Sequence, residues 1–179
     1  MAEITRTELM LALIAAGEHP RLSGLDCSGL DLSHIDLHGA DLDGADLSEC
    51  TLHRANLTGC TLTRANLTSA DLSHARMGKI KAQHAIFYRA RLSLADLRAA
   101  DCEHALLRDA ELGETDFSEA FLCHANFQGT HCHHAIFRGA NCTDALWEHA
   151  DLTAALFNHA VHPPAGVVIR DSQAQRRLA

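Results

Sequence analysis

The feature that most constrains the fold of this chain is a period of five residues. Between residues 36 and 75 every fifth residue is leucine, from Leu37 to Leu72. Two residues before each leucine stands an isoleucine, alanine or cysteine. A period of five matches neither the 3.6-residue repeat of a helix nor the two-residue repeat of a strand. The pattern therefore indicates a short structural unit that repeats by stacking on its neighbours.

The repeat keeps one register through most of the chain. Its leucine position, called the centre here, recurs without insertion or deletion from Cys27 to Phe157, and most centres are leucine or phenylalanine. The position two residues earlier is alanine in most repeats. A unit with two apolar residues buries them only when neighbouring units stack on it. If stacked coils are spaced as strands in a sheet, at roughly 4.8 Å, about seven coils make a rod on the order of 30 Å long.

The repeated A(D/N)LXX pattern resembles the pentapeptide-repeat family, over roughly residues 20 to 162. The resemblance implies an all-β fold, a right-handed quadrilateral parallel β-helix in which four repeats make one coil. The alanine position and the centre would point inward and the other three residues outward. The Asp, Asn or Thr before each centre can accept hydrogen bonds from nearby backbone at tight turns.

Three segments are expected along the chain. Residues 1–19 hold a short N-terminal capping helix over residues 4–17, with a Thr5–Glu8 capping box and a stop at Gly17. Residues 20–162 form the β-helix. Residues 163–179 are a C-terminal tail that begins with two prolines, and Val167 to Ile169 are a candidate strand for a cap or a dimer contact.

Composition and cysteine placement limit the cellular compartments in which the protein is expected. The formal net charge is −8, and no apolar run approaches the ~18 residues of a membrane span. The N-terminus lacks a secretory pattern. Six of the seven cysteines fall on inward positions and Cys123 falls on an outward one. Free core cysteine is typical of a reducing compartment, so we expect a cytoplasmic protein without a disulfide framework.

The residues favour a protein-binding module over an enzyme. The sequence has no phosphate-binding glycine loop, no G-x-S-x-G and no HExxH motif, so catalytic and cofactor-binding residues are not expected. The acidic balance disfavours direct binding of nucleic acid, since phosphate binding requires Lys and Arg. Acidic residues are spread round the expected rod.

Two kinds of outward residue are candidates for an interaction surface, and both sets follow from stacking at intervals of 20. The acidic candidates are Asp41, Asp43, Asp101 and Glu103. The apolar candidates are Ile86, Leu106 and Leu146, with Tyr88 beside them. Exposed apolar rows often mark partner surfaces, although β-branched and apolar residues also occur on a tolerant β surface without binding anything.

Three histidines are a weaker candidate, for a metal site. His84, His104 and His124 are spaced by 20 and should stack on one face. A coil spacing of roughly 4.8 Å exceeds the ~3.5 Å between donors that share one zinc ion. We therefore expect a solvated histidine ladder, with at most incidental nickel binding, and no physiological metal or other cofactor.

The resemblance also suggests a partner. The pentapeptide-repeat family includes quinolone-resistance proteins that imitate duplex DNA and bind DNA gyrase, and this chain is similar to them in length, repeat type and acidity. The alternative is a structural scaffold or regulatory protein with a different protein partner. A homodimer through the C-terminal end is expected as well, because the open last coil needs a cover and one self-complementary patch suffices for two-fold symmetry.

Overall fold

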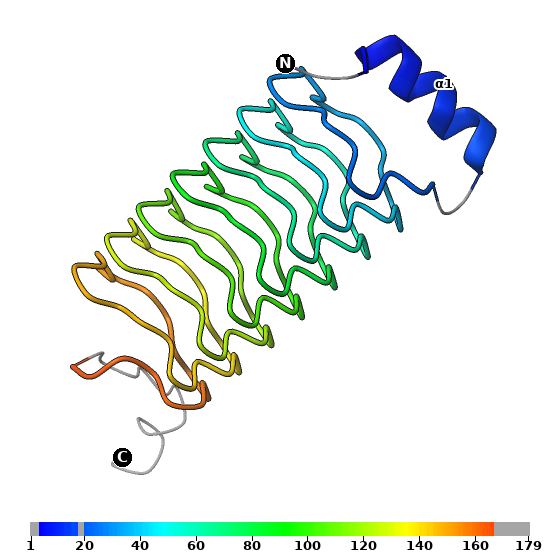
Figure 1. The fold of residues 1–179 in the computed structure, drawn as a ribbon. Helices are drawn as coiled ribbons and strands as arrows, with labels where there is room; N and C mark the ends of the chain where they lie inside the picture. Colours follow the sequence, from blue (N-terminus) through cyan, green and yellow to red (C-terminus); the bar gives the residue numbers. More distant parts are fainter. Residues whose placement is uncertain (1–3, 18–19, 167–179) are drawn as a thin grey trace.

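The protein is described here by a computed structural model that covers residues 4–17 and 20–166. One helix, α1 (Arg6–Ala16), lies at the N-terminal end of a stack of coils (Figure 1). The remaining described residues form no extended strand. They make isolated one-residue parallel bridges instead. The candidate strand at Val167 to Ile169 lies outside the described residues.

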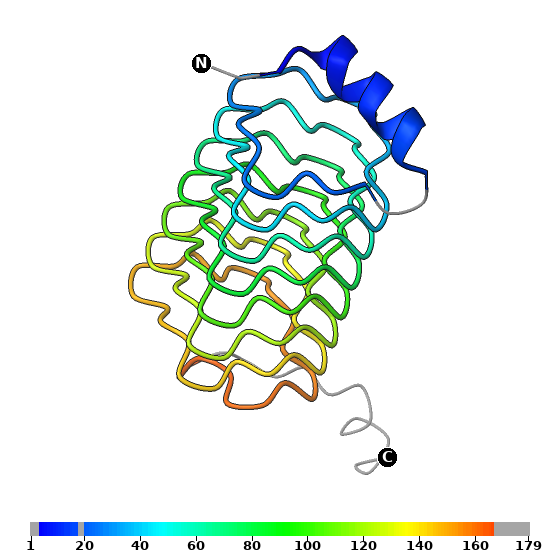
Figure 2. The same cartoon turned by 45° about the vertical axis from the view of Figure 1, so that its right-hand side comes forward.

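The coils repeat every 20 residues. Every fifth residue from Arg21 to Asn141 forms a parallel bridge with the residue 20 positions later. Four bridges per coil mean four five-residue repeats per coil, and residues 21–160 make seven coils. Figure 2 shows these coils as successive turns of one winding chain, similar in size and stacked in sequence order from the N-terminal end. The five-residue period therefore produces a solenoid, as expected.

Backbone hydrogen bonds join each coil to its neighbours at regular points. In one coil, the N–H of Leu42 donates to the carbonyl of Thr61 at 2.8 Å, and the N–H of Asp41 donates to the carbonyl of Pro20 at 2.9 Å. The same two bonds recur in most repeats. The buried backbone thus finds its partners in the adjacent coils, as a buried backbone must.

Each repeat ends in a tight turn whose last residue has positive φ, as at Arg54 (φ 56°) and His104 (φ 58°). The side chain before the centre stabilises many of these turns. Asp46 Oδ1 accepts a hydrogen bond from the Ser48 N–H at 2.9 Å, and Asn66 Oδ1 accepts one from the Thr68 N–H at 3.1 Å. The expected role of Asp and Asn at this position is confirmed.

The core is one continuous column of alanine positions and centres. Leu57 and Ala65 are fully buried, as are nearly all their equivalents up to Ala140. Phe117, Phe127 and Phe137 pack against one another, with ring centroids 5.2–5.9 Å apart. Two threonines replace alanine, and each buried hydroxyl finds a backbone carbonyl: Thr115 donates to Leu92 at 2.8 Å and Thr130 to Phe127 at 2.7 Å.

The five-residue register is kept through residues 76–90, although the centre Ala82 is smaller than the leucine found at most centres. Arg76 and Lys81 bridge to the residues 20 positions later, so no bulge forms. Ile80 and Phe87 are fully buried and flank Ala82 in sequence. These two large side chains supply apolar volume near the small centre.

Helix α1 begins with the expected capping box. The Thr5 side chain accepts from the Glu8 N–H at 3.2 Å, and the Glu8 carboxylate accepts from the Thr5 N–H at 2.8 Å. Leu9 is buried within the hydrophobic core, and Arg6 donates to the Ser33 carbonyl of the first coil at 3.1 Å. The helix therefore packs on the coil stack. Among the described residues, no helix combines the length and apolar character needed to cross a membrane.

Candidate functional site

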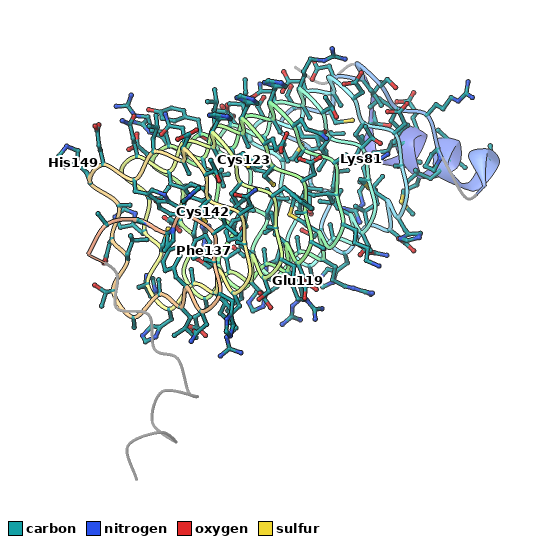
Figure 3. All side chains as sticks on the ribbon, turned by 90° about the horizontal axis from the view of Figure 1, so that it is seen from below. Lys81, Glu119, Cys123, Phe137, Cys142 and His149 are labelled. Atoms are coloured by element: carbon teal, nitrogen blue, oxygen red, sulfur yellow. The ribbon has the colours of Figure 1, made fainter. Side chains whose placement is uncertain are left out.

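The outward side chains form four faces, which we name by their bridge residues. Face A contains bridge residues 21, 41, 61, 81, 101, 121, 141 and 161. Face B contains 26 to 146, face C 31 to 151 and face D 36 to 156, each in steps of 20. Each face also carries the two turn residues that follow each centre. Figure 3 shows the side chains pointing outward around the rod, with Phe137 inside it.

The acidic candidates lie on face A as two pairs. Asp41 and Asp43 share one coil, and Asp101 and Glu103 lie three coils further on. At about 4.8 Å per coil the two pairs are roughly 14 Å apart along the rod. Bridge residue Lys81 lies between them. The structure thus places all four on one face but does not bring them into one cluster.

Several of these carboxylates already have partners. Arg64 donates to Asp43 Oδ2 at 2.6 Å, and Ser23 donates to Asp41 Oδ2 at 2.9 Å. Asp101 accepts from the Gln83 side chain. The ion pair of Asp43 is solvent-exposed on the arginine side, so its contribution to stability is small, but it reduces the negative potential of that pair of acids.

The apolar candidates lie on face B as expected. Ile86 and Leu106 are bridged directly, whereas Asn126 stands between Leu106 and Leu146. Leu106 and Leu146 are 44% and 47% exposed, which is high for leucine. Tyr88 lies on the same face, half-buried, with the Arg89 guanidinium 4.9 Å from its ring centroid. The three apolar residues therefore lie in one row on face B, and one polar residue, Asn126, interrupts that row.

The three histidines stack on face A. The ring centroids of His84 and His104 are 4.9 Å apart, and those of His104 and His124 are 4.8 Å apart, with nearly parallel rings. His124 Nδ1 lies 3.9 Å from Asp144 Oδ2. Parallel rings at this spacing do not converge on one point, and the described residues contain no group of three or more side chains placed to hold a metal ion. The expected ladder geometry is present.

The cysteines divide as their positions predict. All seven are free, six are buried, and only Cys123 is partly exposed. Burial raises the pKa of Cys102 and Cys132 to about 12, which keeps both thiols protonated at neutral pH. Two of the buried thiols replace alanine and donate to the preceding coil: Cys50 to the Cys27 carbonyl and Cys60 to the Leu37 carbonyl, both at 2.9 Å.

One feature of the surface was not anticipated from the sequence. Face D carries a hollow of about 530 Å³ whose lining includes Gly78, three basic residues and two acidic ones. The basic residues are Arg76, Lys79 and Arg98. The sequence signal was visible in the basic cluster at residues 76–81, but the hollow itself depends on which side chains lie 20 positions away.

Comparison with known proteins agrees with this architecture. The family model for pentapeptide repeats matches residues 21–59, 45–81, 80–112, 105–141 and 135–161, with eight copies. These matches cover most of the chain, which therefore belongs to the pentapeptide-repeat family. Proteins of this family are generally structural or protein-interaction modules.

Solved structures of pentapeptide-repeat proteins are also similar to this chain. HetL from Nostoc sp. strain PCC 7120, involved in heterocyst differentiation regulation, is 25% identical, with 89% of this chain and 95% of HetL covered and a TM-score of 0.36. QnrB1, a plasmid-mediated fluoroquinolone resistance protein, is 20% identical, with 90% of each chain covered and a TM-score of 0.36. Rfr23 from Cyanothece 51142 is 19% identical, with 86% and 98% covered and a TM-score of 0.32. A search of curated proteins gave no match.

Proposed function

We propose that this protein is a non-enzymatic protein-binding module whose acidic rod imitates duplex DNA and binds DNA gyrase. The observation that carries the proposal is the distribution of carboxylates along a straight stack of seven coils in a chain of net charge −8. At about 4.8 Å per coil the stack is about 34 Å long, close to one turn of B-DNA at 34–36 Å. We also infer the right-handed, four-sided coil typical of the family.

Binding would be electrostatic. A topoisomerase that holds duplex DNA presents a basic surface, and a rod of opposite charge is steered toward it and competes with DNA. Among the four acidic candidates on face A, the Glu103 carboxylate is the most available to a partner, because its side chain has no hydrogen-bond or ion-pair partner among the described residues. Asp43 is partly neutralised by Arg64. We therefore expect Asp101 and Glu103 to contribute more than Asp41 and Asp43.

The test is a gyrase supercoiling assay with the purified protein. Inhibition, or protection of gyrase from a quinolone, should appear at low salt and weaken as salt rises, because surface charge is screened over ~10 Å at 0.1 M. The double variant Asp101→Asn, Glu103→Gln should act more weakly than the wild type. The double variant Glu111→Gln, Glu114→Gln on face C removes the same charge and is the matched control. No effect on gyrase at any salt concentration would exclude this function.

The runner-up is a structural scaffold or regulator with a different protein partner, and it is favoured by the exposed apolar side chains. Leu106 and Leu146 on face B and Phe121 on face A are each 44–51% exposed. Contacts to such residues would depend little on salt. A partner captured equally well at high and low salt, and lost with Leu106→Ser, would support the scaffold over the DNA mimic.

We further propose a homodimer through the C-terminal end. Trp147 and Leu152 are only partly buried in the last coil, whereas equivalent centres in earlier coils are fully buried. The Trp147 indole N–H is buried without a hydrogen-bond partner among the described residues. A second copy covering this end would bury both side chains. Light scattering on the full chain and on a chain ending at Ala160 tests this, and a monomeric full chain at high micromolar concentration would exclude it.

We also propose that the protein is cytoplasmic, and its free thiols support this proposal. Six buried cysteines are free and each is separated from solvent by the core. Such cysteines fit a reducing compartment. Fractionation of the native host with an antibody against the protein would test the assignment, and recovery in an oxidising compartment would exclude it.

A further inference from the structure

We infer that the hollow on face D is a binding site for a phosphate monoester. This site is independent of the proposed gyrase surface, since the acidic candidates lie on face A. The hollow, of about 530 Å³, is lined by residues of four consecutive coils, and Gly78 is one of them. Its volume exceeds that of a single carboxylate or phosphate, so it admits the anionic group together with part of the attached organic group.

The hollow exists because one side chain is missing from a column. Thr58, Gly78 and Arg98 occupy equivalent positions in three successive coils, and the first and third have side chains that form the walls of the hollow. A Cβ atom at Gly78 would lie 3.7 Å from the Arg98 carbonyl oxygen, which is ordinary contact. A larger residue could therefore be placed here without strain, and it would fill the space.

Three cations surround this space. Arg76 and Lys79 come from the coil of Gly78, and Arg98 comes from the next coil. Neither Arg76 nor Lys79 forms an ion pair within the described part of the chain. Arg76 is bridged to Asp96, and its charge contributes a small part of the lowering of the Asp96 pKa.

The lining also contains two acids, Asp96 and Glu119. With three cations and two acids, its net charge is +1, in a protein whose total is −8. Outside the lining, Asp116 Oδ2 lies 3.9 Å from Arg98 Nε and offsets part of the Arg98 charge. The attraction for an anion therefore comes mainly from Arg76 and Lys79.

Arg98 is held in place before any ligand arrives. Its Nε and Nη2 donate to the two Asp96 oxygens at 2.8 and 2.7 Å, and Asp96 also accepts from the Arg98 N–H at 3.1 Å. This clamp lowers the pKa of Asp96, chiefly through the hydrogen bond from the Arg98 side chain. The Nη1 group has no partner among the described residues, and its donors remain for an oxyanion. A guanidinium fixed in this way loses little entropy on binding.

The ligand class follows from this set of donors. Two cations whose side chains donate to no carboxylate among the described residues, together with a fixed guanidinium, match a compact dianion with several acceptor oxygens. A phosphate monoester is close to −2 at pH 7. A single carboxylate offers one charge and two oxygens, and would leave one of the cations without a partner. Each charge-assisted hydrogen bond lost should weaken binding by about tenfold.

The experiment is an NMR titration of the full-length, isotope-labelled protein with inorganic phosphate and with glycerol 3-phosphate, at constant ionic strength. We expect saturable shifts of the Gly78, Lys79 and Arg98 amides, with glycerol 3-phosphate binding at least as tightly as phosphate. Lys79→Gln should weaken binding by about tenfold, and Gly78→Thr should weaken it by filling the hollow with all charges kept. Lys81→Gln, which removes the same charge on face A, is the matched control and should have less than a twofold effect.

Three results would overturn the inference. The first is the absence of saturable shifts at these amides. The second is an equal loss for Lys79→Gln and Lys81→Gln, which would mean screening of the whole charge and no defined site. The third is tighter binding of acetate than of phosphate, which would assign the hollow to carboxylates. Thermal melting of each variant confirms that it is folded, and none of these outcomes depends on gyrase.

Discussion

Replacing one centre in the middle of the stack measures how much the core column stabilises the fold. Leu67 is fully buried and lies between Leu47 and Phe87, its equivalents in the adjacent coils, both also fully buried. The coils above and below are held by backbone bonds, such as Leu67 N–H to the Ile86 carbonyl at 2.7 Å. The column therefore has little freedom to collapse into a space left by a shorter side chain.

Leu67→Ala should lower the free energy of unfolding by about 3 kcal/mol, the sum of lost burial and an unrelaxed cavity. For an ordered region of about 140 residues, this corresponds to a fall in melting temperature of about 10 °C. Thr68→Ala is the matched control, because Thr68 is the next residue and points outward. Its backbone bond to Asn66 Oδ1 at 3.1 Å is kept, so its effect should stay within about 0.5 kcal/mol.

Circular dichroism during thermal and urea unfolding gives both values. Similar shifts for the two variants would refute the assignment of inward and outward positions. A fall of less than about 2 °C for Leu67→Ala would show that the column relaxes far more than its backbone bonding implies. A split transition in Leu67→Ala alone would indicate that the stack unfolds in segments, as repeat proteins with weak interfaces do.

Three further outcomes are expected. Asp46→Ala should lower stability by about 1 kcal/mol in urea unfolding, since Asp46 accepts from Ser48 at 2.9 Å and from Asn66 at 3.1 Å; an unchanged midpoint would contradict the role of these turns. A thiol reagent at pH 8 should label one cysteine per folded chain, and Cys123→Ser should abolish that labelling, because burial raises the pKa of Cys60 and Cys142 to about 12 and excludes the reagent; rapid labelling of several thiols in the native state would refute this. Hydrogen bonds lower the pKa of Asp96 and other turn carboxylates below the ordinary 3.8, so their stabilisation is present above about pH 4 and is lost as the pH falls through the lowered values; a melting temperature that rises on acidification from pH 5 to 3 would contradict the sign.

The inward residues and the coil length could be predicted from the sequence, because both depend on one register that never breaks. Leu57 is buried for the same reason as the other centres before the last coil, and no knowledge of distant contacts is needed to place it. The stacking of His84, His104 and His124 follows from the same interval of 20. The capping box at Thr5 could be predicted as well, since it depends on residues three positions apart.

The contacts between surface side chains were harder to predict, because a long side chain there can reach several partners or extend into solvent. Spacing alone places Arg64 one coil after Asp43, but whether its guanidinium reaches that carboxylate or points into solvent depends on rotamers. The same holds for the clamp of Asp96 on Arg98. The hollow at Gly78 could not be foreseen from that glycine alone, since Gly113 at the same turn position has the His133 ring against it. It requires walls contributed by neighbouring coils.

Because each coil has four repeats of five residues, insertions and deletions can change the length of the rod without changing the face on which each side chain lies, or the reverse. Removing 20 residues would shorten the stack by one coil and leave every downstream side chain on its original face. Removing five would preserve the core equally well, because one repeat replaces another, yet would move every downstream residue round by a quarter of a coil. The length of the rod and the face on which downstream side chains lie can thus change independently during evolution. A single five-residue event would carry the histidine ladder, or the basic hollow, to another side of the same rod.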